Sequence, residues 1–203
     1  MSYSQFTLES LKTTFGITIV ETAGIFANVP EVKYSNYLTE TLRYNIPLAL
    51  SIASEKARSE MIVTPILIEI RKLLSEAVSL FSGNNFEVDT EKGLSGFCDF
   101  LISMSPEQLF IEAPVVTIVE AKNDKIESGL AQCMAEMIAA QLFNQGKENN
   151  IKTVYGVVTT GSVWKFMKLE EQVITIDLQE YFINQVGKII GIIKSGIEAN
   201  RSK

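Results

Sequence analysis

Residues 114 to 137, PVVTIVEAKNDKIESGLAQCMAEM, begin as an apolar run and continue as a helical pattern. A nearly continuous apolar run is typical of a central strand that is covered on both faces. This run ends on Glu120 and Lys122, a carboxylate and an amine two residues apart. Because alternate side chains of an extended segment lie on one face, the pattern predicts that both groups share one face at the end of a central strand.

A second carboxylate, Asp99, stands inside the apolar segment GFCDFLIS at residues 96 to 103. An unpaired ionised group is costly to bury, so Asp99 needs compensation. If the two strands pair, Asp99 meets Glu120 and Lys122 at one end of the sheet. Neighbouring carboxylates destabilise each other unless a divalent cation lies between them. The three residues therefore predict a Mg²⁺ site, in which Lys122 orients or deprotonates a metal-activated water.

The elements around this site are read from periodicity. Strand-like segments at 86 to 91, 96 to 103 and 115 to 121 precede a helix over about 125 to 143. A hairpin around Gly161-Ser162, a strand VITIDL and a closing helix over 179 to 199 follow. Before the strands, an apolar stripe predicts a helix from 54 to 81 that kinks or restarts at Pro65 and stops at SGNN, residues 82 to 85.

The N-terminal part has mostly helical patterns over residues 6 to 50, with Thr7 and Ser35 as caps and an end before Pro47. Residues 16 to 24, GITIVETAG, fit a short strand or an extended connection. The order of elements predicts one α/β domain over residues 1 to 203, in which helices sandwich a mixed β-sheet. The isoleucine-rich closing helix either covers the core or forms the surface of a homodimer.

The composition limits the chemistry that is available. The chain has 203 residues, of which 46 % are hydrophobic and 21 % are charged, so it is long enough to build one hydrophobic core. Its longest apolar runs are far shorter than the ~20 residues that a membrane-spanning helix needs. No secretory signal is visible, so we expect a cytoplasmic protein. Histidine is absent, which excludes serine–histidine and cysteine–histidine catalysis. Cys98 and Cys133 are expected to be buried thiols. The net charge of −6 argues against strong non-specific nucleic-acid binding, although a local basic cleft remains compatible with it.

Asp99 in an apolar strand and VEAK at the end of the next, with a helix before and after, resemble the PD-(D/E)XK nuclease superfamily. Cys98 stands where that family's motif has proline. The resemblance implies a restriction-endonuclease-like fold whose αβββαβ core covers about residues 54 to 170. Residues 1 to 53 would then be a helical addition and residues 179 to 199 an extra C-terminal helix. It also implies that Asp99 and Glu120 bind Mg²⁺ or Mn²⁺ and that Lys122 positions the water that attacks DNA.

Two further features resemble members of this family. Many carry a glutamate on the helix before the sheet, and Glu55 and Glu60 are the candidates. Glu60 is favoured as a third metal ligand because it is nearer the expected kink and the sheet. Many also carry a glutamine on the helix after the lysine, where this chain has Gln132, with Glu136 one turn later. The resemblance thus implies a catalytic set whose members are Asp99, Glu120, Lys122, Gln132 and Glu60.

The sequence also allows interpretations other than an active nuclease. Glu120 and Lys122 fit a solvated strand end, and Asp99 fits a structural carboxylate. Glu55 and Glu60 fit an ion-paired surface helix. The acidic balance and the lack of a basic stripe favour a nuclease-fold module that no longer cuts and serves in regulation or assembly. Besides an active nuclease and a non-cutting module, a non-nuclease α/β fold that carries the motif by chance is also possible from the sequence.

Overall fold

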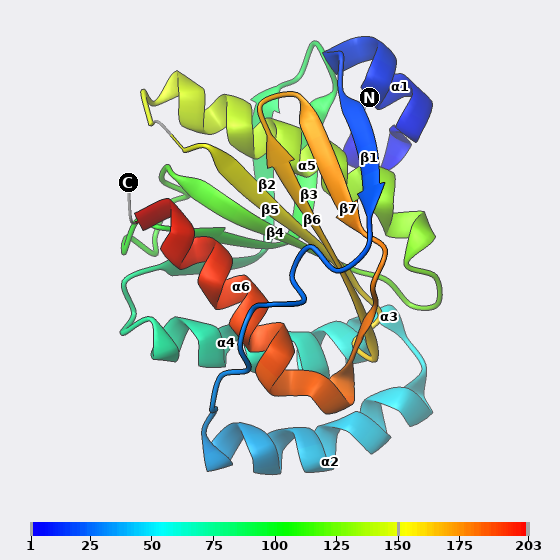
Figure 1. The fold of residues 1–203 in the computed structure, drawn as a ribbon, viewed down its shortest axis with the longest axis vertical. Coiled ribbons are helices and arrows are strands. Elements are labelled where there is room, and N and C mark those ends of the chain that lie inside the picture. The colour runs from blue at the N-terminus through cyan, green and yellow to red at the C-terminus, as the bar shows by residue number, and fades with distance from the viewer. Residues whose placement is uncertain (1, 150, 202–203) are drawn as a thin grey trace.

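The computed structural model describes residues 2 to 149 and 151 to 201 (Figure 1). The helical elements are η1 (Tyr3–Gln5), α1 (Leu8–Phe15), α2 (Asn36–Ile52), α3 (Glu55–Arg58), the π-helical turn η2 (Ser59–Val63), α4 (Thr64–Leu73), α5 (Glu127–Gly146), η3 (Ile183–Gln185) and α6 (Val186–Arg201). The strands are β1 (Thr18–Thr22), β2 (Ser79–Asp89), β3 (Leu94–Ser103), β4 (Val115–Ala121), β5 (Thr153–Thr159), β6 (Val163–Glu170), β7 (Val173–Asp177) and β8 (Tyr181–Phe182).

The strands of the described residues form one mixed sheet in the order β1-β7-β6-β5-β4-β3-β2, with β8 paired to β6. The pairs β1–β7 and β4–β5 are parallel and the other pairs are antiparallel. Helix α5 and the N-terminal segment lie on one face, and α4 and α6 lie on the other, with α2 outside α4 (Figure 1). The predicted α/β class, with a mixed sheet between helices, is confirmed.

A separate apolar core fills each face of the sheet. One packs Leu67 of α4 and Ile190 of α6 against strand residues that include Val119. The other packs Met137 of α5 against residues that include Ile118, the next position along β4. Side chains one position apart on β4 enter different cores, because successive residues of a strand point to opposite faces. The near-continuous apolar pattern of β4 therefore reports its central place in the sheet.

Several connections match their predictions. Strands β3 and β4 are antiparallel across the loop at 104 to 114, and Gly161 at φ +78° turns the chain between β5 and β6. Helix α5 joins the parallel strands β4 and β5. Cys98 and Cys133 are buried free thiols, as expected.

The predicted helix over residues 54 to 81 is wrong in its last part, residues 74 to 81. Helix α4 ends at Leu73, and Ser75 and Glu76 turn the chain with positive φ values of 54° and 58°. Strand β2 then runs straight through SGNN, the segment expected to be a stop. Its backbone pairs with β3 from Ser79 to Asp89, and the polar side chains of SGNN are exposed on this edge strand. Pairing with β3 thus overrides the local preference of these residues for a turn.

Proline positions explain how the helices before the sheet are joined. Helix α2 passes through Pro47 to Ile52, so the predicted end before Pro47 is wrong. An irregularity at Pro65 is present, but it is a π-helical turn that leads directly into α4 at Thr64. The backbone stays helical at Val63 and Thr64, so the helix does not restart with a cap there. Pro65 has no N–H for the Met61 carbonyl, and the Asn45 side chain donates to that oxygen instead at 2.9 Å. The amide of α2 thus repairs the break and ties α2 to the helix over the sheet.

The two ends of the chain are less purely helical than expected. The last helix begins at Val186 and not at residue 179, because β8 and η3 precede it. Strand β1, in the segment expected to be a helical addition, joins the main sheet beside β7. Asp177 of β7 is fully buried and accepts hydrogen bonds from the Gly24 and Gln179 N–H groups and the Tyr181 hydroxyl, at 2.7, 2.9 and 3.1 Å. This carboxylate fastens the chain after β1 to the chain after β7.

None of the helices in residues 2 to 149 and 151 to 201 is both long enough and apolar enough to cross a membrane.

The start of α2 depends on Glu69 of α4, whose side chain is 3 % exposed. Its two carboxylate oxygens accept hydrogen bonds from the Ser35 N–H at 2.6 Å and the Ser35 hydroxyl at 2.9 Å. Glu69→Ala leaves both donors unpaired, so we expect the free energy of unfolding to fall by about 1–3 kcal/mol in urea titrations. Glu40→Ala, on the exposed side of α2, is the matched control and should change it by less than about 0.5 kcal/mol. Equal unfolding midpoints for the two variants would contradict this role for Glu69.

Candidate functional site

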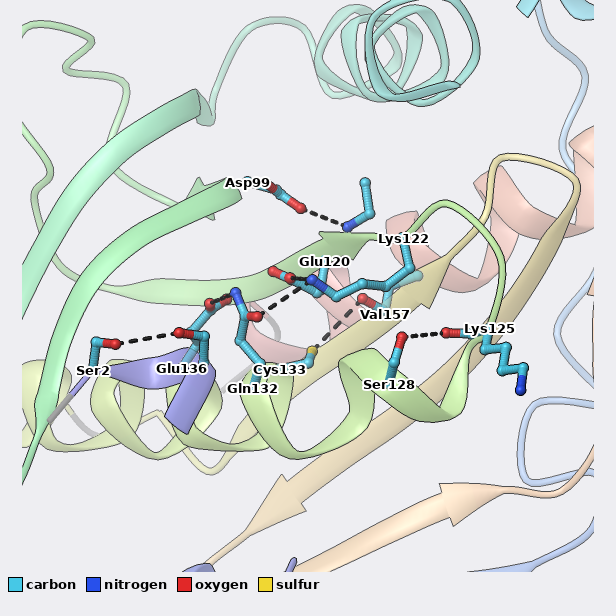
Figure 2. A network of polar contacts seen from close by, with 12 residues as sticks. Ser2, Asp99, Glu120, Lys122, Lys125, Ser128, Gln132, Cys133, Glu136 and Val157 are labelled. Carbon is cyan, nitrogen blue, oxygen red and sulfur yellow. Dashed lines mark hydrogen bonds and ion pairs between the residues drawn. The ribbon is translucent and has the colours of Figure 1, made fainter. Parts of the chain in front are cut away.

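The site begins where the pairing of β3 with β4 ends. The last pair toward this end joins Phe100 to Val119, and at the next position Asp99 Oδ2 accepts a hydrogen bond from the Ala121 N–H at 2.7 Å. The Asp99 side chain thus accepts the hydrogen bond that a backbone carbonyl of β3 would accept in a continued strand pair. This bond holds the Asp99 carboxylate at the end of β4. Figure 2 shows Asp99 on one side of this strand end and Glu120 and Lys122 beside it.

Glu120 is a buried carboxylate with one charged partner. Its side chain is 1 % exposed, and Oε1 forms an ion pair with the Lys122 ammonium. Oε2 is also buried and has no hydrogen-bond partner within the described residues. Burial raises the pKa of the Glu120 carboxyl to about 8, the charge of Asp99 adds to the increase, and Lys122 opposes it. Glu120 is therefore held in a place that disfavours its charge unless a further cation is present.

The ammonium of Lys122 is held charged at the other end of this ion pair. Burial favours the neutral amine, but the Glu120 carboxylate outweighs it and raises the pKa of Lys122. The backbone N–H of Lys122 donates to Thr159 of β5 at 2.8 Å, which fixes the residue after β4 ends. Gly129 of α5 leaves room for its side chain, because a Cβ there would lie 3.0 Å from Lys122 Cγ and 2.7 Å from Val158 Cγ1.

Helix α5 adds two polar residues to the same contacts. Gln132 Oε1 accepts from Lys122 Nζ at 3.3 Å, and Gln132 Nε2 donates to Glu136 Oε1 at 3.1 Å (Figure 2). Glu136 is fully buried, and burial, followed by the charge of Glu120, raises the pKa of its carboxyl well above the ordinary range. From the sequence, Glu136 was expected only as a neighbour of Gln132 on the same helical face. The signal for its burial was its four-residue spacing from Gln132 within an otherwise apolar turn.

Asp99 opens onto solvent, which Glu120 does not. It is half-buried and lines a cleft of about 240 Å³ between the strand ends and the α3–η2 segment. Burial raises the pKa of the Asp99 carboxyl, while the Ala121 hydrogen bond and the Lys122 charge oppose that increase. The expectation that Asp99 is a core carboxylate is therefore only partly met, because its strand position is central but the cleft exposes it.

The two helical glutamates differ in their relation to the site. Glu60 lines the Asp99 cleft, but its side chain is 58 % exposed and forms an ion pair with Lys56 at 2.9 Å. Glu55 lines the same cleft, and its charge acts on both Glu120 and Lys122. The structure thus brings together Asp99, Glu120, Lys122 and Gln132, and places Glu60 at the cleft in an ion pair of its own.

The carboxylates of this site fit a magnesium ion that takes most of its ligands from water and substrate phosphate. Within the described part of the chain, no group of three or more aspartate, glutamate, cysteine or histidine side chains lies close enough to hold a metal ion. Two neighbouring carboxylates are available, Asp99 and Glu120, and one buried oxygen of Glu120 lacks a partner. Mg²⁺ is commonly held by one or two carboxylates together with waters and substrate phosphates. These residues therefore fit such an ion without forming a complete cage for it.

Comparison with known proteins gives no further assignment: no family profile matches this chain, and no curated protein matches it.

The burial of Glu136 predicts a pH dependence of folding stability, which can be measured without an activity assay. Because its pKa is raised in the folded state, the stabilisation from its neutral carboxyl is complete below the ordinary pKa of 4.5 and is lost as pH rises through the folded pKa. Glu136→Gln removes this loss. Above pH 5, the difference in free energy of unfolding between Glu136→Gln and wild type should therefore increase in favour of the variant. The increase is about 1.4 kcal/mol per pH unit over the range in which Glu136 is ionised in unfolded wild type but neutral in folded wild type.

Urea titrations between pH 5 and 8 in a chelating buffer measure this difference. Glu127→Gln, on the exposed first turn of the same helix, is the control and should track wild type at every pH. A constant difference between Glu136→Gln and wild type would contradict the neutral buried state.

Proposed function

We propose that this protein is a Mg²⁺-dependent nuclease that hydrolyses phosphodiester bonds of DNA. Asp99 and Glu120 would hold the ion, Lys122 would position the attacking water, and Gln132 would support Lys122. The observation that carries the proposal is the pair of neighbouring carboxylates at the end of β4, in which Glu120 is tied to an ammonium and retains a buried oxygen without a partner.

The topology around the site supports a restriction-endonuclease-like core. The elements follow the order α4, β2, β3, β4, α5 and β5. Strands β2, β3 and β4 are successively antiparallel, and β5 returns parallel to β4 after α5. This is the αβββαβ order implied by the resemblance to PD-(D/E)XK nucleases, with Asp99 on the second core strand and Glu120 on the third. Strands β1, β6, β7 and β8 would then extend that core.

Buried carboxylates elsewhere in the protein support a functional reading of Glu120. Asp177 accepts hydrogen bonds from three donors within 3.1 Å, and Glu69 accepts two from Ser35. Structural carboxylates in this fold are thus well supplied with donors, as buried polar groups usually are. Glu120 instead faces the charge of Asp99, and a cation between the two would reverse the repulsion. When bound, Mg²⁺ would supply Lewis-acid activation and lower the pKa of a coordinated water.

The protein's own groups would fix the geometry of attack. Lys122 is held by Glu120 and Gln132, so its ammonium has a defined position. Its raised pKa suits donation of a hydrogen bond to water more than removal of a proton. Glu136 accepts from the Gln132 amide nitrogen, and this leaves the amide oxygen turned toward Lys122. Gln132 and Glu136 would therefore act as positioning residues.

The direct test is cleavage of plasmid, linear duplex and single-stranded DNA with Mg²⁺ or Mn²⁺. Asp99→Asn, Glu120→Gln and Lys122→Met should each lower the cleavage rate by at least about 100-fold, because each removes a group that acts at the reacting phosphate. Glu40→Gln, on exposed α2, should cleave like wild type. Calorimetric titration with Mn²⁺ should show binding that Asp99→Asn and Glu120→Gln weaken. Absence of cleavage, with metal binding unchanged in both variants, would contradict the proposal.

A non-cutting module with the same fold is the second candidate, and the charge of the cleft favours it. Of the described side chains that line the Asp99 cleft, Lys56 is the single cation, and it is ion-paired with Glu60. Such a surface is a poor match for a polyanion. Titration that finds no divalent-ion binding dependent on Asp99 would favour a regulatory or assembly role over catalysis.

The packing of Lys122 over α5 gives a paired prediction. Gly129→Ala would place a methyl group against Val158 and Lys122, whereas Gly146→Ala on the same helix meets nothing within 4 Å. We expect Gly129→Ala to displace the ammonium and lower the cleavage rate by roughly tenfold or more, while Gly146→Ala retains wild-type activity. Circular dichroism checks that both variants fold. Equal cleavage rates for the two would contradict the role of Gly129.

A further inference from the structure

Phe97 is an aromatic side chain that the fold leaves outside both cores. It lies on β3 two residues before Asp99, and it is 72 % exposed, whereas Cys98 and Phe100 beside it are buried. A single exposed apolar side chain needs no special explanation. The place of Phe97 relative to the polar residues of the site is what makes it informative.

Phe97 lines a second cleft that adjoins the same polar residues. This cleft has a volume of about 300 Å³, and Gln132 and residues 2 to 4 also line it. Gln132 accepts from Lys122, Lys122 pairs with Glu120, and Asp99 beyond them lines the first cleft. The metal-binding candidates and the lysine thus lie between a cleft at Asp99 and a cleft at Phe97.

The cleft at Phe97 has a rigid wall. Tyr3 is 1 % exposed, and its hydroxyl donates to the Phe86 carbonyl at 2.8 Å. Its ring packs so closely on Gly96 that a Cβ there would lie 3.2 Å from Tyr3 Cδ2. The backbone that presents Phe97 is therefore held in place, and little ordering is needed before a flat ligand can stack on the exposed ring.

The charges of the two clefts limit the kind of nucleic acid that fits. Among their described lining residues, the one cation is Lys56, which is paired with Glu60. Duplex binding without sequence preference depends on the neutralisation of many phosphates. An exposed aromatic ring adds a contact that only an unpaired base can make, and it accepts any base because every base offers a π-face.

We propose that Phe97 is a stacking platform for an unpaired base next to the scissile phosphate, so that the preferred substrate is single-stranded DNA. The inference rests on the proposed nuclease function. A strand whose phosphate lies at Asp99 and Glu120 would bring a neighbouring base over the Phe97 ring. A base inside a duplex would first have to leave its stack, which costs free energy that this acidic surface does not return through phosphate contacts.

Binding is measured first, with the full chain in a chelating buffer. The probes are a 12-nucleotide single strand that carries 2-aminopurine and a fluorescein-labelled hairpin duplex. Phe97→Ala should weaken binding of the single strand by roughly fivefold or more and abolish the stacking-dependent quenching of 2-aminopurine. Phe97→Trp should retain both. Phe110→Ala is the matched control, because Phe110 is also 72 % exposed but lies in the loop at 104 to 114.

Cleavage with Mg²⁺ then separates the two proposals. Phe97→Ala should raise the KM for single-stranded DNA with little change in kcat, and Phe110→Ala should change neither. Phe97-dependent binding without cleavage by wild type would overturn the nuclease function, while showing that Phe97 stacks on unpaired bases of a bound strand. Cleavage that needs Asp99, with Phe97→Ala equal to Phe110→Ala in both assays, would overturn the platform alone. A duplex bound as tightly as the single strand would also overturn it.

Discussion

The burial of the Glu120 carboxylate at the end of a central strand is the constraint around which the site is built. Strands on both sides and α5 beneath it remove water from the group, so its charge must be compensated by neighbours. Lys122 compensates one oxygen, and Asp99 on the adjacent strand adds repulsion. Gly129, Gln132 and Glu136 on α5 are arranged around the ammonium that this carboxylate requires. The polar contacts of α5 thus follow from one charge placed where the fold would otherwise bury apolar atoms.

The contrast among the buried acids separates stability from chemistry. Asp177 and Glu69 are surrounded by backbone and hydroxyl donors, and each fastens a connection between elements. Glu120 and Glu136 have fewer donors; burial raises the pKa of both carboxyls, with a further increase from the charge of Asp99 at Glu120 and from the charge of Glu120 at Glu136. Strongly perturbed carboxyl groups cluster at functional sites, and this supports the role proposed for Glu120.

The sequence predicted those parts of the fold that a local pattern determines. The nearly continuous apolar runs at residues 96 to 103 and 115 to 121 identified two strands covered on both faces, and Asp99 and Glu120 were expected together because adjacent strands bring such positions into contact. The end of α4 was not predictable in this way. Leu74, Val78 and Phe81 continue the helical stripe by their spacing, but in the structure Leu74 and Val78 precede β2 and enter one core, while Phe81 of β2 enters the other. Pairing of residues 79 to 89 with β3, which is a long-range contact, ends the helical pattern. The i,i+4 ion pair of Glu60 with Lys56 is the surface-helix interpretation that the sequence also allowed. The buried state of Glu136 depends on helix packing, which spacing along the chain does not encode.

The parallel pairing of β1 with β7 has a consequence for the order of folding. Thr18 lies beside Val173, so β1 can join the sheet only after the chain as far as β7 has been made. Closing so long a loop is entropically costly and comes late in folding. The central strands β2 to β5, joined by shorter connections, can assemble earlier and would already contain Asp99 and Glu120. Attachment of β1, secured by the bonds of Asp177 to the chain after it, would then be the step that completes the sheet and commits the newly made chain to its final structure.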